Sequence, residues 1–275
     1  MSFFTEKYKG FIFDMDGTIY LEDKMIDGAV ETLNSLIKDE KHLLFVTNKT
    51  TQSKSEYARL LNDNGISISP SQILTATDNC IKFLKKERKG KKFYAIAEEV
   101  FINEIVELGL IFTENPKEIE IIIISLDRNY SKIKFEIAKN ALLNGAEFLA
   151  ANIDNTCPVI NGEIIDAGIV ISDLENSTNR KLQQHFGKPS NFMISSITEK
   201  LEFEKKEYLL IGDRLETDIL MGNKMEIDTV LVNSGVFNNI KNPSNLATYN
   251  IKSIINILKW KNNNCCYKNN NYWNS

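Results

Sequence analysis

Short apolar runs alternate along this chain with longer amphipathic stretches. Two such pairs come first: the run 11–13 with the stretch 29–38, and the run 43–46 with the stretch 53–64. Short apolar runs indicate buried strands, whereas apolar positions three and four residues apart indicate helices that cover a core. The alternation therefore predicts an α/β fold in which helices connect the strands of a parallel sheet.

A second alternation begins after residue 75. It contains, in order, a predicted helix over 82–89, strands over 93–96 and 119–125, a helix over 132–144 and a strand over 147–151. The run 119–125 is rich in isoleucine, which is typical of a strand buried on both faces. From residue 208 the first pattern returns, with predicted strands over 209–211 and 229–232.

The simplest division of the chain is a core interrupted by an inserted domain. We predict a discontinuous, Rossmann-like core over residues 1–78 and 181–261, and an inserted α/β domain over 79–180, because this division needs no long unstructured loop. In the last segment, residues 262–275, seven of the fourteen residues are asparagine. That segment lacks apolar periodicity, so we predict a disordered tail.

The composition narrows the classes of partner. The 275 residues are 43% hydrophobic and 25% charged, as in ordinary globular proteins. The formal net charge of -4 argues against binding to a nucleic-acid polymer. No segment reaches the roughly 18 apolar residues that span a bilayer, so no membrane partner is expected. The four cysteines lack disulfide or metal-ligand spacing, which favours a reducing, cytoplasmic location.

Two carboxylates mark the exit of the first predicted strand. Asp14 and Asp16 lie two residues apart there and are followed at once by Gly17. Carboxylates this close need a cation or a shared proton. An acidic turn after a buried strand is the structural alternative. The calcium loop of a helix–loop–helix motif is excluded, because Thr18 and Ile19 stand where its template requires an acid or amide and a glycine.

Three further polar clusters follow later in the chain. Thr47 and Asn48 come directly after the strand 43–46, Lys188 lies between a glycine and a proline, and Asp213 and Asp218 follow the strand 209–211. Taken singly, these clusters also fit a helix N-cap, a solvated loop cation and an acidic turn. Together they supply carboxylates for a metal, donors for a phosphate and one fixed positive charge.

In this order the clusters resemble the motifs of the haloacid dehalogenase (HAD) superfamily of phosphohydrolases. The matching patterns are Asp-x-Asp-Gly-Thr at 14–18, Thr-Asn at 47–48, Gly-Lys-Pro at 187–189 and Gly-Asp-x-x-x-x-Asp at 212–218. Further likeness, at 16–20 and 232–236 among other places, is to the subfamily typified by the NagD nucleotide phosphatase, p-nitrophenyl phosphatase and pyridoxal phosphate phosphatase. It covers about residues 8–260 and implies a HAD core with a C2-type α/β cap.

The resemblance implies roles for single residues. Asp14 would be the nucleophile that forms an aspartyl phosphate, and Asp16 the general acid and base. Mg²⁺ would be held by Asp14, by the backbone carbonyl of Asp16 and by Asp213. Lys188 would be the catalytic cation, and Asp218 would orient Lys188 or neighbouring backbone.

The remaining roles concern the phosphate and the cap. The phosphate-binding residues implied by the resemblance are Met15, Asp16, Thr47, Asn48 and Lys188. Asn152 and Asp154 are similar to a Thr-Asn-x-Asp element of the subfamily's cap, with Ala151 in place of the threonine. These two residues are therefore expected to help line the substrate pocket.

The implied activity is Mg²⁺-dependent hydrolysis of a small phosphomonoester. Candidate substrates are a nucleotide monophosphate, a sugar phosphate and pyridoxal phosphate. Asp16 argues against dehalogenation, because dehalogenases of this superfamily lack the second aspartate. A phosphomutase and a non-catalytic protein that binds phosphorylated metabolites remain alternatives. The resemblance also leaves a homodimer through the cap open, and it assigns substrate choice to the cap.

Overall fold

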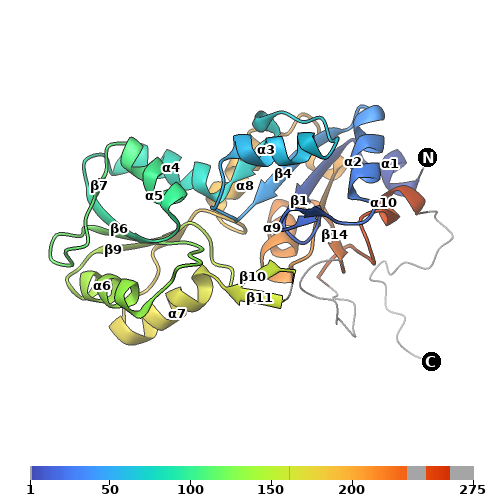
Figure 1. The fold of residues 1–275 in the computed structure, drawn as a ribbon. Helices are drawn as coiled ribbons and strands as arrows, with labels where there is room; N and C mark the ends of the chain where they lie inside the picture. Colours follow the sequence, from blue (N-terminus) through green and yellow to red (C-terminus); the bar gives the residue numbers. More distant parts are fainter. Residues whose placement is uncertain (1, 161, 234–245, 261–275) are drawn as a thin grey trace, which may run out of the picture. The chain divides into compact units, whose positions relative to one another are not determined.

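The computed structural model describes residues 2–160, 162–233 and 246–260. Contacts divide the chain into two units. The first contains Met1–Val46, Ser55–Leu74 and Ile197–Ser275, and the second contains Thr47–Lys54 and Thr75–Ser196. Each unit is built on a β-sheet with helices packed against it (Figure 1). The predicted α/β fold class is confirmed, whereas the tail at 262–275 lies outside the described residues.

The sheet of the first unit has six strands in the order β15-β14-β13-β1-β4-β5. Their bounds are β1 Gly10–Asp14, β4 His42–Thr47, β5 Ile73–Thr75, β13 Tyr208–Gly212, β14 Asp228–Val232 and β15 Tyr249–Ile251. The pairings from β15 through to β4 are all parallel. The strands predicted at 11–13, 43–46, 209–211 and 229–232 each lie within one of these elements.

Helices cover this sheet, and a small hairpin follows β1. The helices are α1 Phe3–Lys7, α2 Ala29–Lys38, α3 Lys54–Asp63, α9 Leu220–Met225 and α10 Asn256–Lys259, and the hairpin is β2 Tyr20–Leu21 with β3 Lys24–Met25. Phe11 and Phe13 of β1 share one core with Leu36 of α2 and Tyr57 of α3. Because side chains alternate along a strand, the buried Ile12 belongs to the opposite face of the sheet.

The second unit has a sheet of five strands in the order β12-β9-β8-β6-β7, and all of its pairings are parallel. Its strands are β6 Lys92–Ile96, β7 Ile111–Phe112, β8 Ile121–Ile124, β9 Glu147–Ala150 and β12 Gln184–His185. An antiparallel hairpin joins β10 Thr156–Val159 to β11 Gly162–Ile165. The helices are α4 Ala76–Glu87, α5 Glu99–Glu107, α6 Lys132–Leu143 and α7 Ala167–Thr178, while α8 Asn191–Thr198 crosses the boundary between the units.

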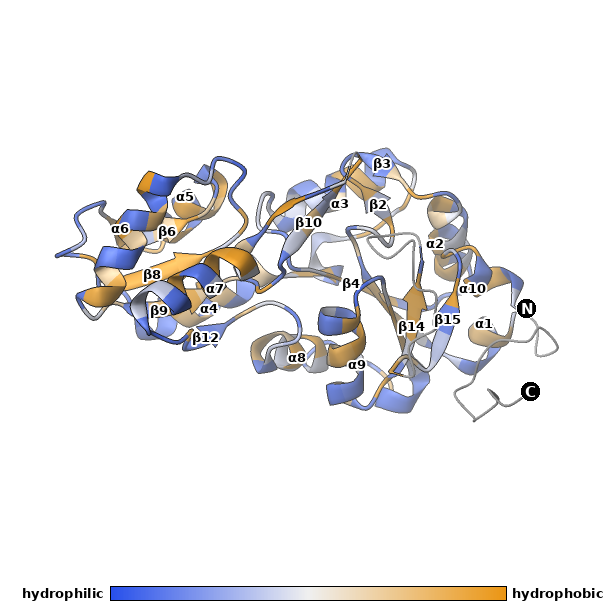
Figure 2. Ribbon diagram, turned by 90° about the horizontal axis from the view of Figure 1, so that it is seen from below, coloured by the Kyte–Doolittle hydropathy of each residue, from blue (hydrophilic) through white to orange (hydrophobic). Residues whose placement is uncertain are grey.

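Strand β8 explains why this unit has three layers. Ile122 and Ile124 pack in a cluster with α6 and α7, whereas Ile121 and Ile123 pack in a separate cluster with α4 and α5. All four isoleucines are buried, and Figure 2 shows β8 as one of the most hydrophobic strands. A run of consecutive β-branched residues therefore serves both faces of the sheet, as predicted for 119–125.

The contact-based units differ from the predicted division of the chain in three places. Residues 47–54, 75–78 and 181–196, which the sequence assigned to the core, have their contacts mainly within the second unit. The division into a core at 1–78 and 181–261 and a cap at 79–180 stays a prediction. Among the helices of the described ranges, none combines the length and apolarity that crossing a bilayer requires.

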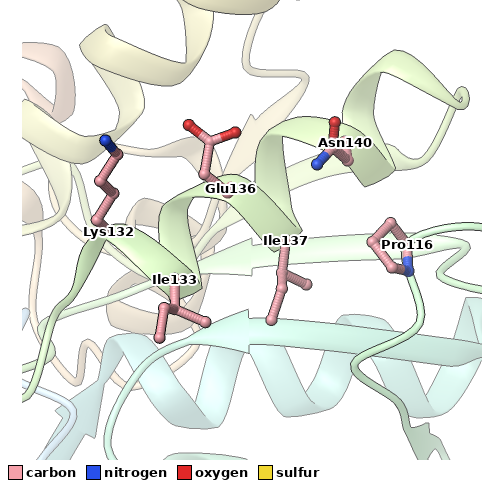
Figure 3. Close-up of a pocket in the computed structure, with 6 residues that line it drawn as sticks. All are labelled: Pro116, Lys132, Ile133, Glu136, Ile137 and Asn140. Atoms are coloured by element: carbon pink, nitrogen blue, oxygen red, sulfur yellow. The ribbon is translucent and has the colours of Figure 1, made fainter.

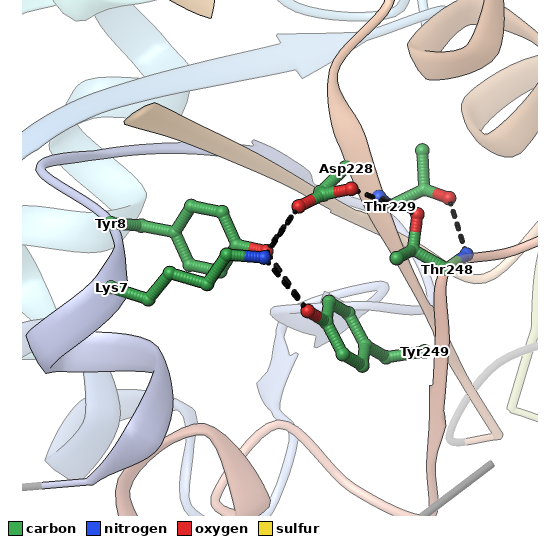
Figure 4. A network of polar contacts seen from close by, with 6 residues as sticks. All are labelled: Lys7, Tyr8, Asp228, Thr229, Thr248 and Tyr249. Carbon is green, nitrogen blue, oxygen red and sulfur yellow. Dashed lines mark hydrogen bonds and ion pairs between the residues drawn. The ribbon is translucent and has the colours of Figure 1, made fainter. Parts of the chain in front are cut away.

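A polar network joins α1 to β14 and β15 of the first unit (Figure 4). Asp228 Oδ2 accepts hydrogen bonds from Lys7 Nζ at 2.8 Å and from the Tyr8 hydroxyl at 2.5 Å. Lys7 Nζ also donates to the Tyr249 hydroxyl at 3.0 Å. Burial raises the pKa of Asp228, but the hydrogen bonds from Lys7 and Tyr8 outweigh that effect, so its pKa lies below the usual value. The network thus fixes the N-terminal helix to the sheet.

Asp228→Asn is expected to lower the free energy of unfolding at pH 7, because it weakens the hydrogen bonds that Asp228 accepts from Lys7 and Tyr8. The expected loss is only about 1 kcal/mol, because Lys7 and Asp228 are both partly exposed to water. Because the pKa of Asp228 is lowered on folding, its contribution is present above about pH 4 and is lost as the pH falls through the folded pKa. The Tm difference between wild type and variant should therefore shrink from pH 7 to pH 3. Exposed Asp63→Asn is the control, and a difference independent of pH would contradict the assignment.

Candidate active site

Three buried carboxylates gather at the carboxyl ends of two neighbouring strands of the first unit. Asp14 is the last residue of β1, and Asp213 directly follows β13. Phe13 is paired in register with Ile211, so the two strand ends are level. One carboxylate oxygen each from Asp14, Asp213 and Asp218 lies within 4.8 Å of the other two. The parallel sheet thus brings together acids that are about 200 residues apart in sequence.

Asp218 reaches this cluster from a wide helical turn. The segment Leu215–Ile219 is a π-helix, a form that occurs often at functional sites. The Asp218 carboxylate accepts a hydrogen bond from the Arg214 backbone N–H at 3.1 Å. A Cβ atom on Gly212 would lie 2.4 Å from Asp218 Cγ. Glycine is therefore required at 212, because the Asp218 side chain packs directly on its backbone.

The Asp14 carboxylate is oriented by the turn that follows it. The buried Thr18 hydroxyl donates to Asp14 Oδ2 at 2.8 Å. Gly17 makes this turn possible, since its φ of 84° is in the left-handed region that glycine adopts without strain. The same carboxylate belongs to the cluster with Asp213 and Asp218. Such an arrangement suits a carboxylate that must attack in one direction.

Asp16 is half-buried and lies next to a fully buried tyrosine. The Tyr20 hydroxyl donates to Asp16 Oδ2 at 3.4 Å, a long contact. Burial raises the pKa of Tyr20 well above its usual value, and electrostatic interactions with Asp16, Tyr57 and Asp14 raise it further. Tyr20 is therefore a neutral hydrogen-bond donor to Asp16 at any physiological pH.

Met15 separates the two acids. Its side chain is buried in the core of the first unit, and its carbonyl accepts hydrogen bonds from the N–H groups of Thr18, Ile19 and Tyr20. If Met15 contacts phosphate as predicted, it therefore does so through its backbone N–H.

The carboxylate cluster fits a hard divalent cation. Carboxylate oxygens are the ligands that Mg²⁺ takes in proteins, and three buried negative charges this close repel one another without a cation. The predicted ligands were Asp14, Asp16 and Asp213. Two of them belong to the cluster, and Asp218 belongs to it as well. The Asp16 carboxylate is not part of it, which is compatible with a ligand role for the Asp16 carbonyl alone.

The second unit contains the predicted phosphate-binding residues Thr47, Asn48 and Lys188, and all three are buried. Helix α3 begins only at Lys54, so neither Thr47 nor Asn48 is its N-cap. Thr47 Oγ1 accepts the Lys49 N–H at 3.0 Å. Lys188 has only 3% of its surface exposed, so it is not a solvated loop cation. The N-cap interpretation of Thr47 and Asn48 and the solvated-cation interpretation of Lys188 are therefore wrong.

Asn48 is held by two partners from distant parts of the chain. Its Oδ1 atom accepts the Lys188 N–H at 2.6 Å, and its Nδ2 atom donates to Asp154 Oδ2 at 2.7 Å. Asn152 Nδ2 donates to the same Asp154 oxygen at 3.2 Å and to Asp166 Oδ1 at 3.0 Å. The structure therefore joins the predicted cap residues Asn152 and Asp154 to the Thr-Asn and Gly-Lys-Pro motifs.

Sequence reasoning gave no role to Thr18, Tyr20 or Asp166. Thr18 and Tyr20 could have been found from their spacing, because residues two and four positions beyond Asp16 return to the strand end across a turn closed by Gly17. Asp166 is the N-cap of α7, and its signal was an acid immediately before an apolar periodic stretch.

A surface pocket on the second unit holds none of these residues. Figure 3 shows Ile133 and Ile137 of α6 on the side opposite Glu136 and Asn140, with Pro116 beyond them. Its single lysine and single glutamate form no titratable cluster. This pocket therefore offers no titratable cluster and none of the predicted site residues.

Comparisons with known proteins give a consistent result. The family model for haloacid dehalogenase-like hydrolases matches residues 11–111, and a HAD-hydrolase-like model matches residues 185–256. The chain is 32% identical over 249 residues to phosphoglycolate phosphatase 1A, chloroplastic, of Arabidopsis thaliana, which covers 82% of this chain and 68% of that protein.

Two further relatives match over nearly their whole length. The acid sugar phosphatase of Staphylococcus haemolyticus is 27% identical over 251 residues, 90% of this chain and 95% of the relative. The solved structure of p-nitrophenyl phosphatase from Archaeoglobus fulgidus superposes with a TM-score of 0.80 at 26% identity, covering 92% of this chain and 99% of that one.

Proposed function

The chain belongs to the haloacid dehalogenase-like hydrolases, and we propose that it is a Mg²⁺-dependent phosphomonoesterase that acts on a small phosphorylated metabolite. The observation that carries the proposal is the cluster of Asp14, Asp213 and Asp218, with Thr18 bonded to one oxygen of Asp14. A metal-binding carboxylate that is also held in one orientation is suited to attack phosphorus.

In the proposed mechanism the Asp14 carboxylate attacks the phosphorus atom and displaces the alkoxide of the substrate. Asp16 protonates that leaving oxygen, so a neutral alcohol departs and an aspartyl phosphate remains on Asp14. Asp16, now a carboxylate, removes a proton from the water that attacks the phosphoaspartate. Inorganic phosphate leaves, Asp14 is a carboxylate again and Asp16 is protonated again, which closes the cycle.

Other residues are proposed to stabilise the negative charge of the phosphoryl group. Lys188 and the Thr47 hydroxyl are proposed to bind phosphoryl oxygens, with the backbone at Met15 and Asp16 as further donors. Mg²⁺ held by Asp14, Asp213 and the Asp16 carbonyl would offset the repulsion between an anionic nucleophile and an anionic substrate. Asp218, which neighbours both acids, supports that arrangement from the adjacent turn.

The named relatives suggest the substrate class. They are called acid sugar phosphatase, phosphoglycolate phosphatase and p-nitrophenyl phosphatase, so each name describes a phosphatase for a small phosphomonoester. We extend that class to this chain, with sugar phosphates, nucleotide monophosphates and pyridoxal phosphate as the candidates. Choice among them is assigned to the cap, near residues 152–168.

Phosphate release by the purified protein tests the proposal. With Mg²⁺, p-nitrophenyl phosphate and a panel of phosphorylated metabolites should each be assayed for inorganic phosphate. Release that is saturable and strongest for one metabolite supports the proposal. Binding of these metabolites without release would favour a non-catalytic binding protein, and transfer of phosphate within a sugar phosphate would favour a mutase.

A further inference from the structure

We propose that Asn48 is a positioning residue for Lys188, and that Asp154 fixes the orientation of the Asn48 amide. The inference rests on the proposed function in one respect, the role of Lys188 in binding phosphoryl oxygens. It changes the predicted role of Asn48 from phosphate ligand to support of another residue's backbone, and it gives Asp154 a task other than lining the pocket.

The side chain of Asn48 pairs with both backbone groups of Lys188. Asn48 Oδ1 accepts the Lys188 N–H at 2.6 Å, and Asn48 Nδ2 donates to the Lys188 carbonyl at 3.3 Å. The second hydrogen of Nδ2 is donated to Asp154 at 2.7 Å. An asparagine amide has two donor hydrogens, and both are used here. Asn48 therefore has no hydrogen left for a phosphate.

Asp154 determines which way the Asn48 amide points. A flipped amide would set its NH₂ group against the Lys188 N–H and its oxygen against the Asp154 carboxylate, so both contacts would become repulsive. An ionised carboxylate only accepts hydrogen bonds, and it therefore selects the orientation in which Asn48 accepts from Lys188. Asn48 and Asp154 are each 8% exposed, so water competes little for these bonds.

Asp154 is itself held in place from two sides. Its carboxylate accepts Asn152 Nδ2, and its backbone carbonyl accepts the Gly168 N–H at 2.7 Å, in the first turn of α7. Asn152 Nδ2 also reaches Asp166, the N-cap of α7. The support of Lys188 thus extends through Asn48 to a helix terminus, which is a rigid anchor.

The glycine before Lys188 permits this close packing. The Gly187 N–H donates to the Ala151 carbonyl at 2.7 Å. A Cβ atom at 187 would lie 2.3 Å from Asn48 Oδ1 and 3.0 Å from that carbonyl. The Gly-Lys-Pro motif is thus packed on the Asn48 amide, and a larger residue at 187 would separate the amide from Lys188.

A double-mutant cycle separates positioning from general structural support. Asn48→Ala, Lys188→Ala and the double variant are compared in kcat/KM for p-nitrophenyl phosphate with Mg²⁺. In the wild-type background Asn48→Ala should lower kcat/KM by about 10- to 100-fold, as is typical of residues that orient a binding group. In the Lys188→Ala background the same change should cost less than about twofold, because the group it positions is gone. Equal losses in both backgrounds would overturn the proposal.

A second readout does not need turnover. Amide hydrogen exchange of Lys188 in the full chain should accelerate in Asn48→Ala and, to a smaller extent, in Asp154→Asn, which keeps the shape but loses the charge. Unchanged exchange in both variants would overturn the proposal. Asn140→Ala, an exposed asparagine on α6, is the matched control and should change neither readout.

The two arms also keep this inference separate from the proposed function. If the wild type releases no phosphate, the proposed function fails. The affinity of the wild type and of the three variants of the cycle for inorganic phosphate, measured by calorimetry, then replaces kcat/KM. If Asn48→Ala does not fold, the milder Asp154→Asn takes its place in both arms. Non-additive losses of phosphate affinity together with faster Lys188 exchange support positioning, whereas additive losses contradict it.

Discussion

Asp14→Asn is expected to lower kcat for p-nitrophenyl phosphate by about 10⁴-fold or more, the size of loss seen when a nucleophile is removed. An amide keeps the shape of the carboxylate but is a poor nucleophile towards phosphorus. The Thr18 hydroxyl can still donate to the amide oxygen, so the local hydrogen bond is retained. The substitution also removes one of three clustered negative charges, so Tm without Mg²⁺ should not fall. Phosphate release and thermal unfolding are the two measurements.

The matched control for this experiment is Asp63→Asn, an aspartate exposed at the end of α3. It should retain wild-type kcat. Activity of Asp14→Asn within tenfold of wild type would exclude Asp14 as the nucleophile. A loss of activity accompanied by a large fall in Tm would instead assign Asp14 a structural role.

The strands could be predicted from the sequence wherever burial determined the residue type. The isoleucines of β8 are all buried because helices cover both faces of that sheet, and a run of consecutive β-branched residues is typical of such a strand. Helix α1 was not predicted, since its five residues are too few to show a helical period. Helix α4 begins at Ala76 and not at 82, because Thr75 caps it by accepting the Asp78 N–H. That signal is present in the sequence but is weaker than apolar periodicity.

The site residues also fall into those that the sequence predicts and those whose role depends on the folded chain. Asp14 and Asp213 could be predicted because each follows an apolar strand, and parallel strands end at one edge of a sheet. The place of Asp218 in the carboxylate cluster depends on the π-helix and on its packing against Gly212, neither of which has a sequence period. The partners of Asn48 lie 106 and 140 residues away, so only the folded chain brings them together. Motif position indicated that Asn48 matters, but not what it does.

Addition of Mg²⁺ is expected to raise the Tm of the wild-type protein, because the proposed ligands Asp14 and Asp213 lie together in the carboxylate cluster only in the folded state. At about 100 times Kd the stabilisation is about 2.7 kcal/mol. For units of this size that corresponds to a rise in Tm of about 5–10 °C. Removal of divalent ions with EDTA should stop phosphate release, and Mg²⁺ should restore it. Thermal unfolding and phosphate release with and without Mg²⁺ measure both effects.

Asp213→Asn should separate stability from activity at the same cluster. Without Mg²⁺ its Tm should equal or exceed that of wild type, since one of three mutually repelling charges is gone. With Mg²⁺ its Tm should rise by less than about 2 °C, because an amide is a weaker ligand than a carboxylate and the binding term shrinks. Phosphate release should fall together with that lost rise, whereas Asp63→Asn should keep both. An Asp213→Asn variant that is destabilised without Mg²⁺ and keeps the full rise in Tm would show that the three acids hold the fold together and do not bind the cation. A Tm that is unchanged or higher without Mg²⁺, together with a smaller rise on addition of Mg²⁺, would mean that the acids at the ends of β1 and β13 repel one another in the absence of the cation and bind it when it is present.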